Sequence, residues 1–153
     1  MSCCQTQVRA YLQFGRDLHQ AGCDLFELLA ESPMGAHQSF LNDYLLKQER
    51  NLVGVIKDGL KSNSSGVLDS WVDLKPKLDI SQLLPPPEDQ PNPGRDELSS
   101  IVFHYRDVWI GYLEAAISAA SDRNARELFQ SLHRLEVNER NHLTSAIIQL
   151  DDL

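Results

Sequence analysis

Glu139 and His142 are a carboxylate and an imidazole placed three residues apart on what should be the inner face of a helix. Apolar residues recur around them at spacings of three and four, which puts them all on one side of an α-helix. Burying two ionisable groups in such a stripe is costly unless each finds a partner. The pair therefore predicts a buried polar site in the last helix. The apolar members of the stripe are Leu128, Leu132, Leu135, Ala146 and Leu150.

Two more ionisable side chains fall on predicted buried faces. Glu49 interrupts a leucine-rich stripe near the middle of the second helix, and His19 shares the inner stripe of the first. An unpaired buried carboxylate is strongly destabilising, so Glu49 should have a partner or a water molecule nearby. Gly15 and Gly22 lie on the same face as His19, where each costs the helix about 1 kcal/mol relative to alanine. We expect them to make room for a neighbouring helix or for a bulky side chain from it.

Four helices are predicted to position these residues within a single domain, 1–153. Apolar periodicity places the helices at about 6–31, 34–60, 96–120 and 122–150, and no strand-like alternation of useful length is present. The connections inside the first pair and inside the second pair are short, which favours antiparallel neighbours. The predicted fold is therefore all-α, an antiparallel four-helix bundle of two helical hairpins.

A proline-rich crossover, 61–95, joins the two hairpins and contains six of the seven prolines. It is long enough to cross the whole bundle, which would let the second and third helices run parallel. The run Pro85-Pro86-Pro87 favours extended polyproline geometry. The crossover should nevertheless lie along the bundle, because several of its residues need cover: Trp71, Leu74, Leu78, Ile80, Leu83 and Leu84.

The charge, the hydropathy and the cysteine content of the sequence indicate which classes of protein are expected. The net charge of −8 and the absence of a basic cluster argue against nucleic-acid binding. No apolar run approaches the ~20 residues of a membrane span, and the start lacks the features of a signal peptide, so we expect a cytoplasmic protein. Three cysteines fit a reducing compartment. Cys3 and Cys4 could be a lipidation point, half of a metal site or two free thiols in a frayed terminus.

Two hairpins, a long crossover and the motif Glu139-x-x-His142 resemble the ferritin-like superfamily, on its rubrerythrin-like side. As architecture the resemblance covers the whole chain. It implies two metal ions held by one Glu from each of the first and third helices and by Glu-x-x-His from the second and fourth. This sequence departs from that pattern, because Leu52 stands where the second histidine would be. The first and third helices also offer no inward carboxylate.

The resemblance therefore implies a degenerate metal site made of Glu49, Glu139, His142 and His19. Two carboxylates are too few for two iron ions, so we expect no dimetal oxidase and no catalytic residues. The simplest interpretation is a non-catalytic binding or scaffold protein with a buried hydrogen-bonded network and no cofactor. An alternative is that the four residues hold a single Fe, Mn or Zn ion, which would allow an oxidase-type activity. A third is an apolar pocket lined by the glycine-thinned first helix and the aromatic third helix.

Other ionisable residues are predicted to lie outside the site. His133 and Glu136 flank the expected core face and should be solvated or at its rim. The sequence has no glycine-rich phosphate loop, no cysteine pair at zinc spacing and no nucleophile elbow. The expected partner is an unidentified protein or a second copy of the chain, forming a dimer.

Overall fold

The computed structural model describes residues 4–84 and 93–152, and most of this chain is helical. The predicted all-α class is therefore confirmed. The long helices are α1 (Val8–Leu29), α2 (Ala36–Ser62), α5 (Arg95–Ala119) and α6 (Arg123–Asp151). The short elements are β1 (Thr6–Gln7), α3 (Ser65–Leu68), β2 (Trp71–Val72) and α4 (Ile80–Leu83).

The helix ends lie close to their predicted positions, with differences that have local causes. α1 begins two residues late because Thr6 and Gln7 form β1. α2 begins at Ala36, because Gly35 takes the N-cap position with an extended backbone. α6 begins after Asp122, whose side chain accepts a hydrogen bond from the backbone N–H of Ala125. Such a cap satisfies one of the free N–H groups at a helix start.

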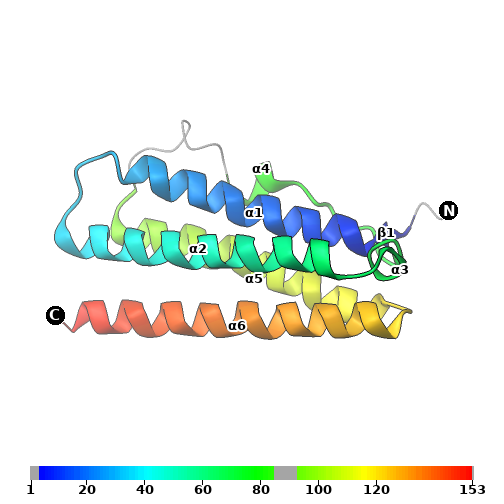
Figure 1. The fold of residues 1–153 in the computed structure, drawn as a ribbon. Coiled ribbons are helices and arrows are strands. Elements are labelled where there is room, and N and C mark those ends of the chain that lie inside the picture. Colours follow the sequence, from blue (N-terminus) through cyan, green and yellow to red (C-terminus); the bar gives the residue numbers. More distant parts are fainter. Residues whose placement is uncertain (1–3, 85–92, 153) are drawn as a thin grey trace.

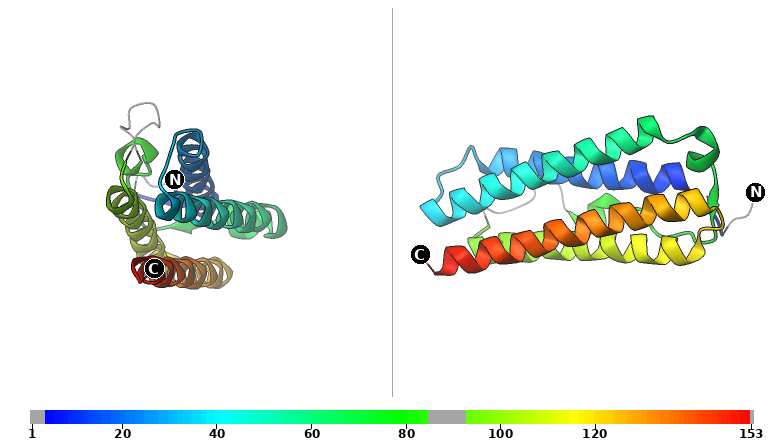
Figure 2. Two further views of the ribbon diagram at one scale, coloured as in Figure 1. Left: turned by 90° about the vertical axis from the view of Figure 1, so that its left-hand side faces the viewer. Right: turned by 60° about the horizontal axis from the view of Figure 1, so that its bottom comes forward.

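The four long helices lie along one another (Figure 1). The sequence colours show that α1 and α2 run in opposite directions, as do α5 and α6, whereas α2 and α5 both run from left to right. α1 packs mainly on α2, and α5 mainly on α6. In the two further views these pairs form two layers, and α2 contacts α6 across them (Figure 2). Any group that bonds to both layers therefore helps to join them.

The crossover is tied to one end of the helices by backbone hydrogen bonds. β2 pairs antiparallel with β1, and Val72 also bridges to Ala120 in the turn between α5 and α6. The N–H of Asp73 donates to the carbonyl of Ala119 at 3.3 Å. Strands of two residues are too short to show alternation, so the sequence could not predict this pairing.

The described part of the crossover lies along the helices, as predicted. Leu84 is buried, and four further apolar side chains are partly buried against the core: Leu74, Leu78, Ile80 and Leu83. The polyproline geometry expected for Pro85-Pro86-Pro87 lies outside the described residues.

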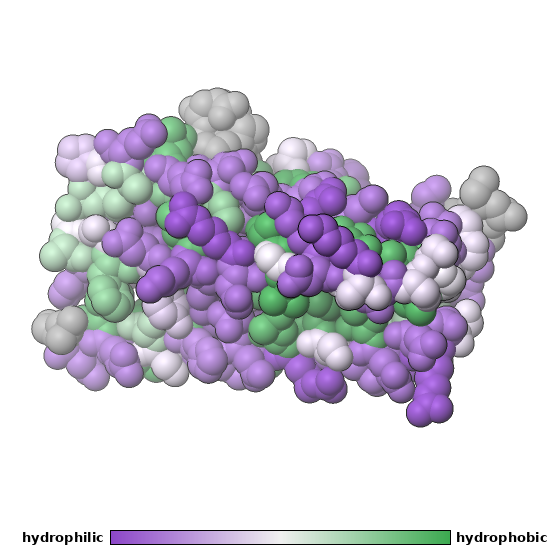
Figure 3. Space-filling view, in the orientation of Figure 1, coloured by the Kyte–Doolittle hydropathy of each residue, from purple (hydrophilic) through white to green (hydrophobic). Residues whose placement is uncertain are grey.

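The surface facing the viewer in Figure 3 is mostly hydrophilic, with hydrophobic residues exposed between α2 and α6. No helix in the described ranges is long and apolar enough to cross a membrane. Cys23 is buried, and burial and the nearby Glu49 raise the pKa of its thiol to about 12. Cys4 is exposed, and Cys3 lies outside the described part of the chain.

Candidate functional site

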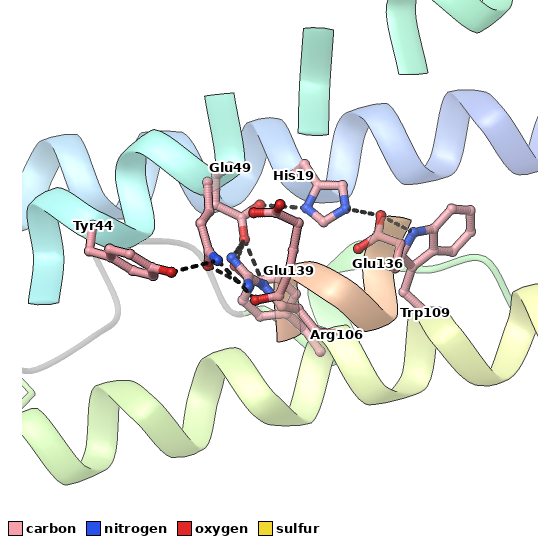
Figure 4. Close-up of polar contacts among 9 residues, drawn as sticks. His19, Tyr44, Glu49, Arg106, Trp109, Glu136 and Glu139 are labelled. Atoms are coloured by element: carbon pink, nitrogen blue, oxygen red, sulfur yellow. Dashed lines mark hydrogen bonds and ion pairs between the residues drawn. The ribbon is translucent and has the colours of Figure 1, made fainter. Parts of the chain in front are cut away.

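His19 lies at the centre of a buried polar network that involves all four long helices (Figure 4). Its Nδ1 lies 2.5 Å from Oε2 of Glu49 on α2, and its Nε2 lies 2.7 Å from Oε2 of Glu136 on α6. The imidazole is fully buried, and so is the Glu49 side chain. One ring therefore bridges carboxylates from two different layers of the fold.

Two cations and a phenol surround the Glu49 carboxylate. Its Oε1 accepts hydrogen bonds from the Tyr105 hydroxyl at 2.5 Å and from Arg106 Nη2 at 2.7 Å, both on α5. Arg106 Nε also donates to this oxygen at 3.1 Å, and Nη1 donates to Oε1 of Gln48 at 2.7 Å. Because Arg106 is fully buried, these bonds occur without competition from solvent.

Glu136 completes the network on α6. Its Oε2 accepts from the indole N–H of Trp109 at 2.8 Å as well as from His19. Its other oxygen, Oε1, is buried and has no hydrogen-bond partner in the described chain. A second link to α6 runs through Gln48, whose Nε2 donates to the backbone carbonyl of Glu139 at 2.9 Å.

The electrostatics of the network keep His19 protonated. Burial by itself lowers the pKa of His19, but the carboxylates of Glu136 and Glu49 outweigh it and raise the pKa to about 10. Burial raises the pKa of Glu49, but His19 and Arg106 outweigh it and lower the pKa to about 2. At neutral pH both ring N–H groups of His19 donate, and Glu49 is ionised.

The glycines of α1 make the network possible. A β-carbon on Gly15 would lie 2.4 Å from Cζ2 of Trp109, and one on Gly22 would lie 2.9 Å from the Tyr105 hydroxyl oxygen. The prediction that these glycines make room for bulky side chains is therefore confirmed. Because the indole and the phenol occupy this space, the interpretation of an apolar ligand pocket between α1 and α5 is wrong.

Of the four predicted ligands, His19 and Glu49 are fully buried and bonded to each other, whereas Glu139 and His142 lie outside this contact. The prediction that His142 faces the core is wrong, because its side chain is 67% exposed. Glu139 lies at the edge of the core with its side chain 17% exposed, and its Oε1 is 3.8 Å from His142 Nδ1. The position expected of this pair belongs to Glu136, which was predicted to be at the rim and is 1% exposed.

The error has a geometric cause. The buried face of α6 is rotated from the predicted stripe, since it includes Phe129 and Leu143, which the stripe left out. Counting these two would have moved the centre of the face towards Glu136. Arg106 was also missed, although it lies four residues after Val102 and four before Ile110, both buried. Because charged residues are seldom core positions, this spacing by itself does not predict a buried arginine.

The network does not fit a metal ion. A metal-binding imidazole must be neutral with a free lone pair, whereas His19 is protonated and both of its nitrogens donate to carboxylates. Glu49 already accepts from Arg106 and Tyr105. Within residues 4–84 and 93–152, no group of three or more His, Cys, Asp or Glu side chains is arranged to hold a metal.

The arrangement is instead suited to holding helices together. Two internal cations, the imidazolium of His19 and the guanidinium of Arg106, neutralise buried carboxylate charge and link α1, α2, α5 and α6. Comparison of the chain with protein-family models, with curated proteins and with solved structures finds no match.

Proposed function

We propose that this chain is a ferritin-like four-helix bundle, of two antiparallel hairpins joined by the crossover, that acts as a non-catalytic binding or scaffold protein. Its site corresponds to a dimetal centre in which protein cations take the place of metal ions. The observation that carries this proposal is the fully buried ion pair between Arg106 and Glu49, with Nη2 and Oε1 2.7 Å apart.

The position of each side chain supports a degenerate centre. In the ferritin-like arrangement the second helix supplies a glutamate, and Glu49 on α2 matches it. The third helix would supply a carboxylate, but α5 supplies Arg106. The fourth helix supplies Glu136 followed three residues later by Glu139, so a carboxylate stands where the pattern has a histidine. A guanidinium beside the remaining carboxylates repels a divalent cation.

The same groups argue for a structural role. A catalytic acid or base must exchange protons with a substrate, yet His19, Glu49 and Arg106 are inaccessible to solvent and already paired. Removing one partner of a buried ion pair typically costs about 3–5 kcal/mol. The network therefore holds the two hairpins together through buried ion pairs. Binding of a partner would then take place on the outer surfaces of the bundle.

Metal analysis of the full-length protein, purified without chelators, tests the proposal. We expect no stoichiometric Fe, Mn or Zn, and no change in the unfolding temperature when Fe(II), Mn(II) or Zn(II) is added. About one equivalent of metal that is lost in His19→Gln but kept in His142→Ala would overturn the proposal. It would instead favour the alternative of a single-metal centre with oxidase-type activity. The exposed His142 is the matched control for nonspecific histidine binding.

A further inference from the structure

The outer face of α2 carries a hollow of about 520 Å³ whose walls, within the described chain, come from this one helix. Phe40 stands in it with 56% of its surface exposed, the second-largest value among the exposed large hydrophobic residues after Ile148. The hollow is mostly apolar but also carries charges of both signs. Its lining residues are Phe40, Asp43, Tyr44, Leu46, Lys47 and Arg50.

These six residues are arranged symmetrically about one level of the helix. Leu45 is fully buried on the opposite side of α2, so the hollow is centred on the outward direction at its level. Each lining residue has a counterpart equally far from Leu45 along the chain. The three pairs are Phe40 with Arg50, Asp43 with Lys47, and Tyr44 with Leu46.

Such a pattern is self-complementary. When two copies of a helix pack antiparallel about a two-fold axis, each residue meets the level of its counterpart in the other copy. Asp43 then lies beside Lys47 of the second copy, and the same contact forms a second time by symmetry. Phe40 comes level with Arg50 of the second copy, a pairing that suits a guanidinium and an aromatic ring.

We propose that the chain forms a two-fold homodimer through the outer face of α2, with the two copies of the helix antiparallel and centred at Leu45. Charge supports a second copy as the occupant. The chain has a net charge of −8, which opposes self-association, but on this face Lys47 balances Asp43. The guanidinium of Arg50 lies 3.1 Å from a carboxylate oxygen of Glu27 on α1, so two copies of the face can meet without a large excess of either charge. Gly54 lies on the same outer face of α2, and a β-carbon built on it would have no neighbour within 4 Å. In the proposed dimer Gly54 lies at the same level as Ala36 of the second copy.

The dimer does not depend on the proposed function of the buried network. Tyr44 touches that network only through a 3.4 Å hydrogen bond from Gln48 Nε2 to its hydroxyl, and the residues changed in the test lie outside the network. Charge reversal tests it in the full-length protein by sedimentation velocity over a dilution series. Wild type should be dimeric. Asp43→Lys and Lys47→Asp should each weaken the dimer about tenfold or more, because each places like charges together. An equimolar mixture of these two variants should recover a dimer, and so should the double variant, since both restore opposite charges across the axis.

Two further substitutions separate the interface from general surface effects. Gly54→Gln should also weaken the dimer, because its side chain would enter the interface. Gly111→Gln is the matched control, since Gly111 is likewise an exposed mid-helix glycine with open space around it, on α5. A wild-type protein that stays monomeric would overturn the proposal. So would a dimer insensitive to these changes on α2, or a mixture of the two charge variants that stays monomeric.

Discussion

Arg106 and Glu49 form an ion pair between α5 and α2 in which both side chains are fully buried, with Nη2 2.7 Å from Oε1. The two residues belong to different layers of the fold, so the pair joins these layers. Neither group can be solvated once the other is removed. Removing one partner is therefore expected to destabilise the protein more than removing one partner of an ion pair at the surface.

Arg106→Met should lower the free energy of unfolding by about 3–5 kcal/mol, because it leaves Glu49 buried with one cation fewer. Urea denaturation followed by circular dichroism measures this change. The control is Arg123→Met, which removes an exposed pair with Glu127, and exposed pairs are worth about 0–1 kcal/mol. Equal losses of stability in the two variants would contradict the claim that the buried Arg106–Glu49 pair holds the layers together. In the double variant Arg106→Met/Glu49→Gln the loss should be smaller than the sum of the two single losses.

Gly15→Ala should destabilise the protein by about 1–3 kcal/mol, since the new methyl group would overlap the Trp109 ring. Gly111→Ala is the matched control. Its β-carbon meets open space, so the better helix propensity of alanine should stabilise the protein by up to about 1 kcal/mol. Thermal unfolding of both variants measures the difference in sign. A stabilising Gly15→Ala would show that the indole does not pack against α1 at this point.

Stability should depend on pH with a sign set by His19. Because its pKa is raised from 6.5 to about 10, the folded state keeps a proton that the unfolded state loses. The contribution is fully present below pH 6.5 and is lost as the pH rises towards 10, by up to about 1.4 kcal/mol per pH unit. Denaturation curves collected across this range measure the slope, and His19→Gln should remove it.

Glu49 governs the acid side of the same profile. Its pKa is lowered from 4.5 to about 2, so its contribution is present above pH 4.5 and is lost as the pH falls towards 2. The groups that face these two residues are Glu136, Tyr105 and Arg106. The network should thus give a plateau between about pH 4.5 and 6.5. If the loss of stability between pH 6.5 and 10 were the same in His19→Gln as in wild type, the pH dependence could not come from His19.

Substitutions on α6 test which of its residues face the core. Glu136→Gln should cost about 1–3 kcal/mol. The amide oxygen can still accept from His19 and Trp109, but the amide NH2 would be a buried donor at the position where Oε1 has no partner, and the imidazolium would lose a counter-charge. His142→Ala should change the free energy of unfolding by less than about 0.5 kcal/mol, as is usual for surface positions, and Glu139→Gln, at the edge of the core, should cost less than Glu136→Gln. Chemical denaturation measures all three, and the reverse order would restore the rotation of α6 predicted from its sequence.

The helices themselves could be derived from the sequence, because their signals are local. Apolar periodicity located α1, α2, α5 and α6 to within about two residues, since propensity and periodicity act over a few turns. Local reasoning also identified Glu49 and His19 as buried polar groups and the glycines of α1 as points of close approach. Each of these residues interrupts an otherwise apolar stripe, so its position alone shows that something must pair with it or fill the space beside it.

The partners of those groups were decided by tertiary structure. A buried stripe spans a wide arc of a helix, so the sequence of α6 permits more than one rotation, and packing against α2 and α5 selects the one that buries Glu136 and exposes His142. Likewise, the sequence of α5 places Arg106 in line with Val102 and Ile110 but does not show which groups would neutralise it there. A guanidinium is stable in the core only where a carboxylate from another helix pairs with it. Glu49 reaches Arg106 only after α2 and α5 have packed together, so the sequence of α5 cannot reveal this pair.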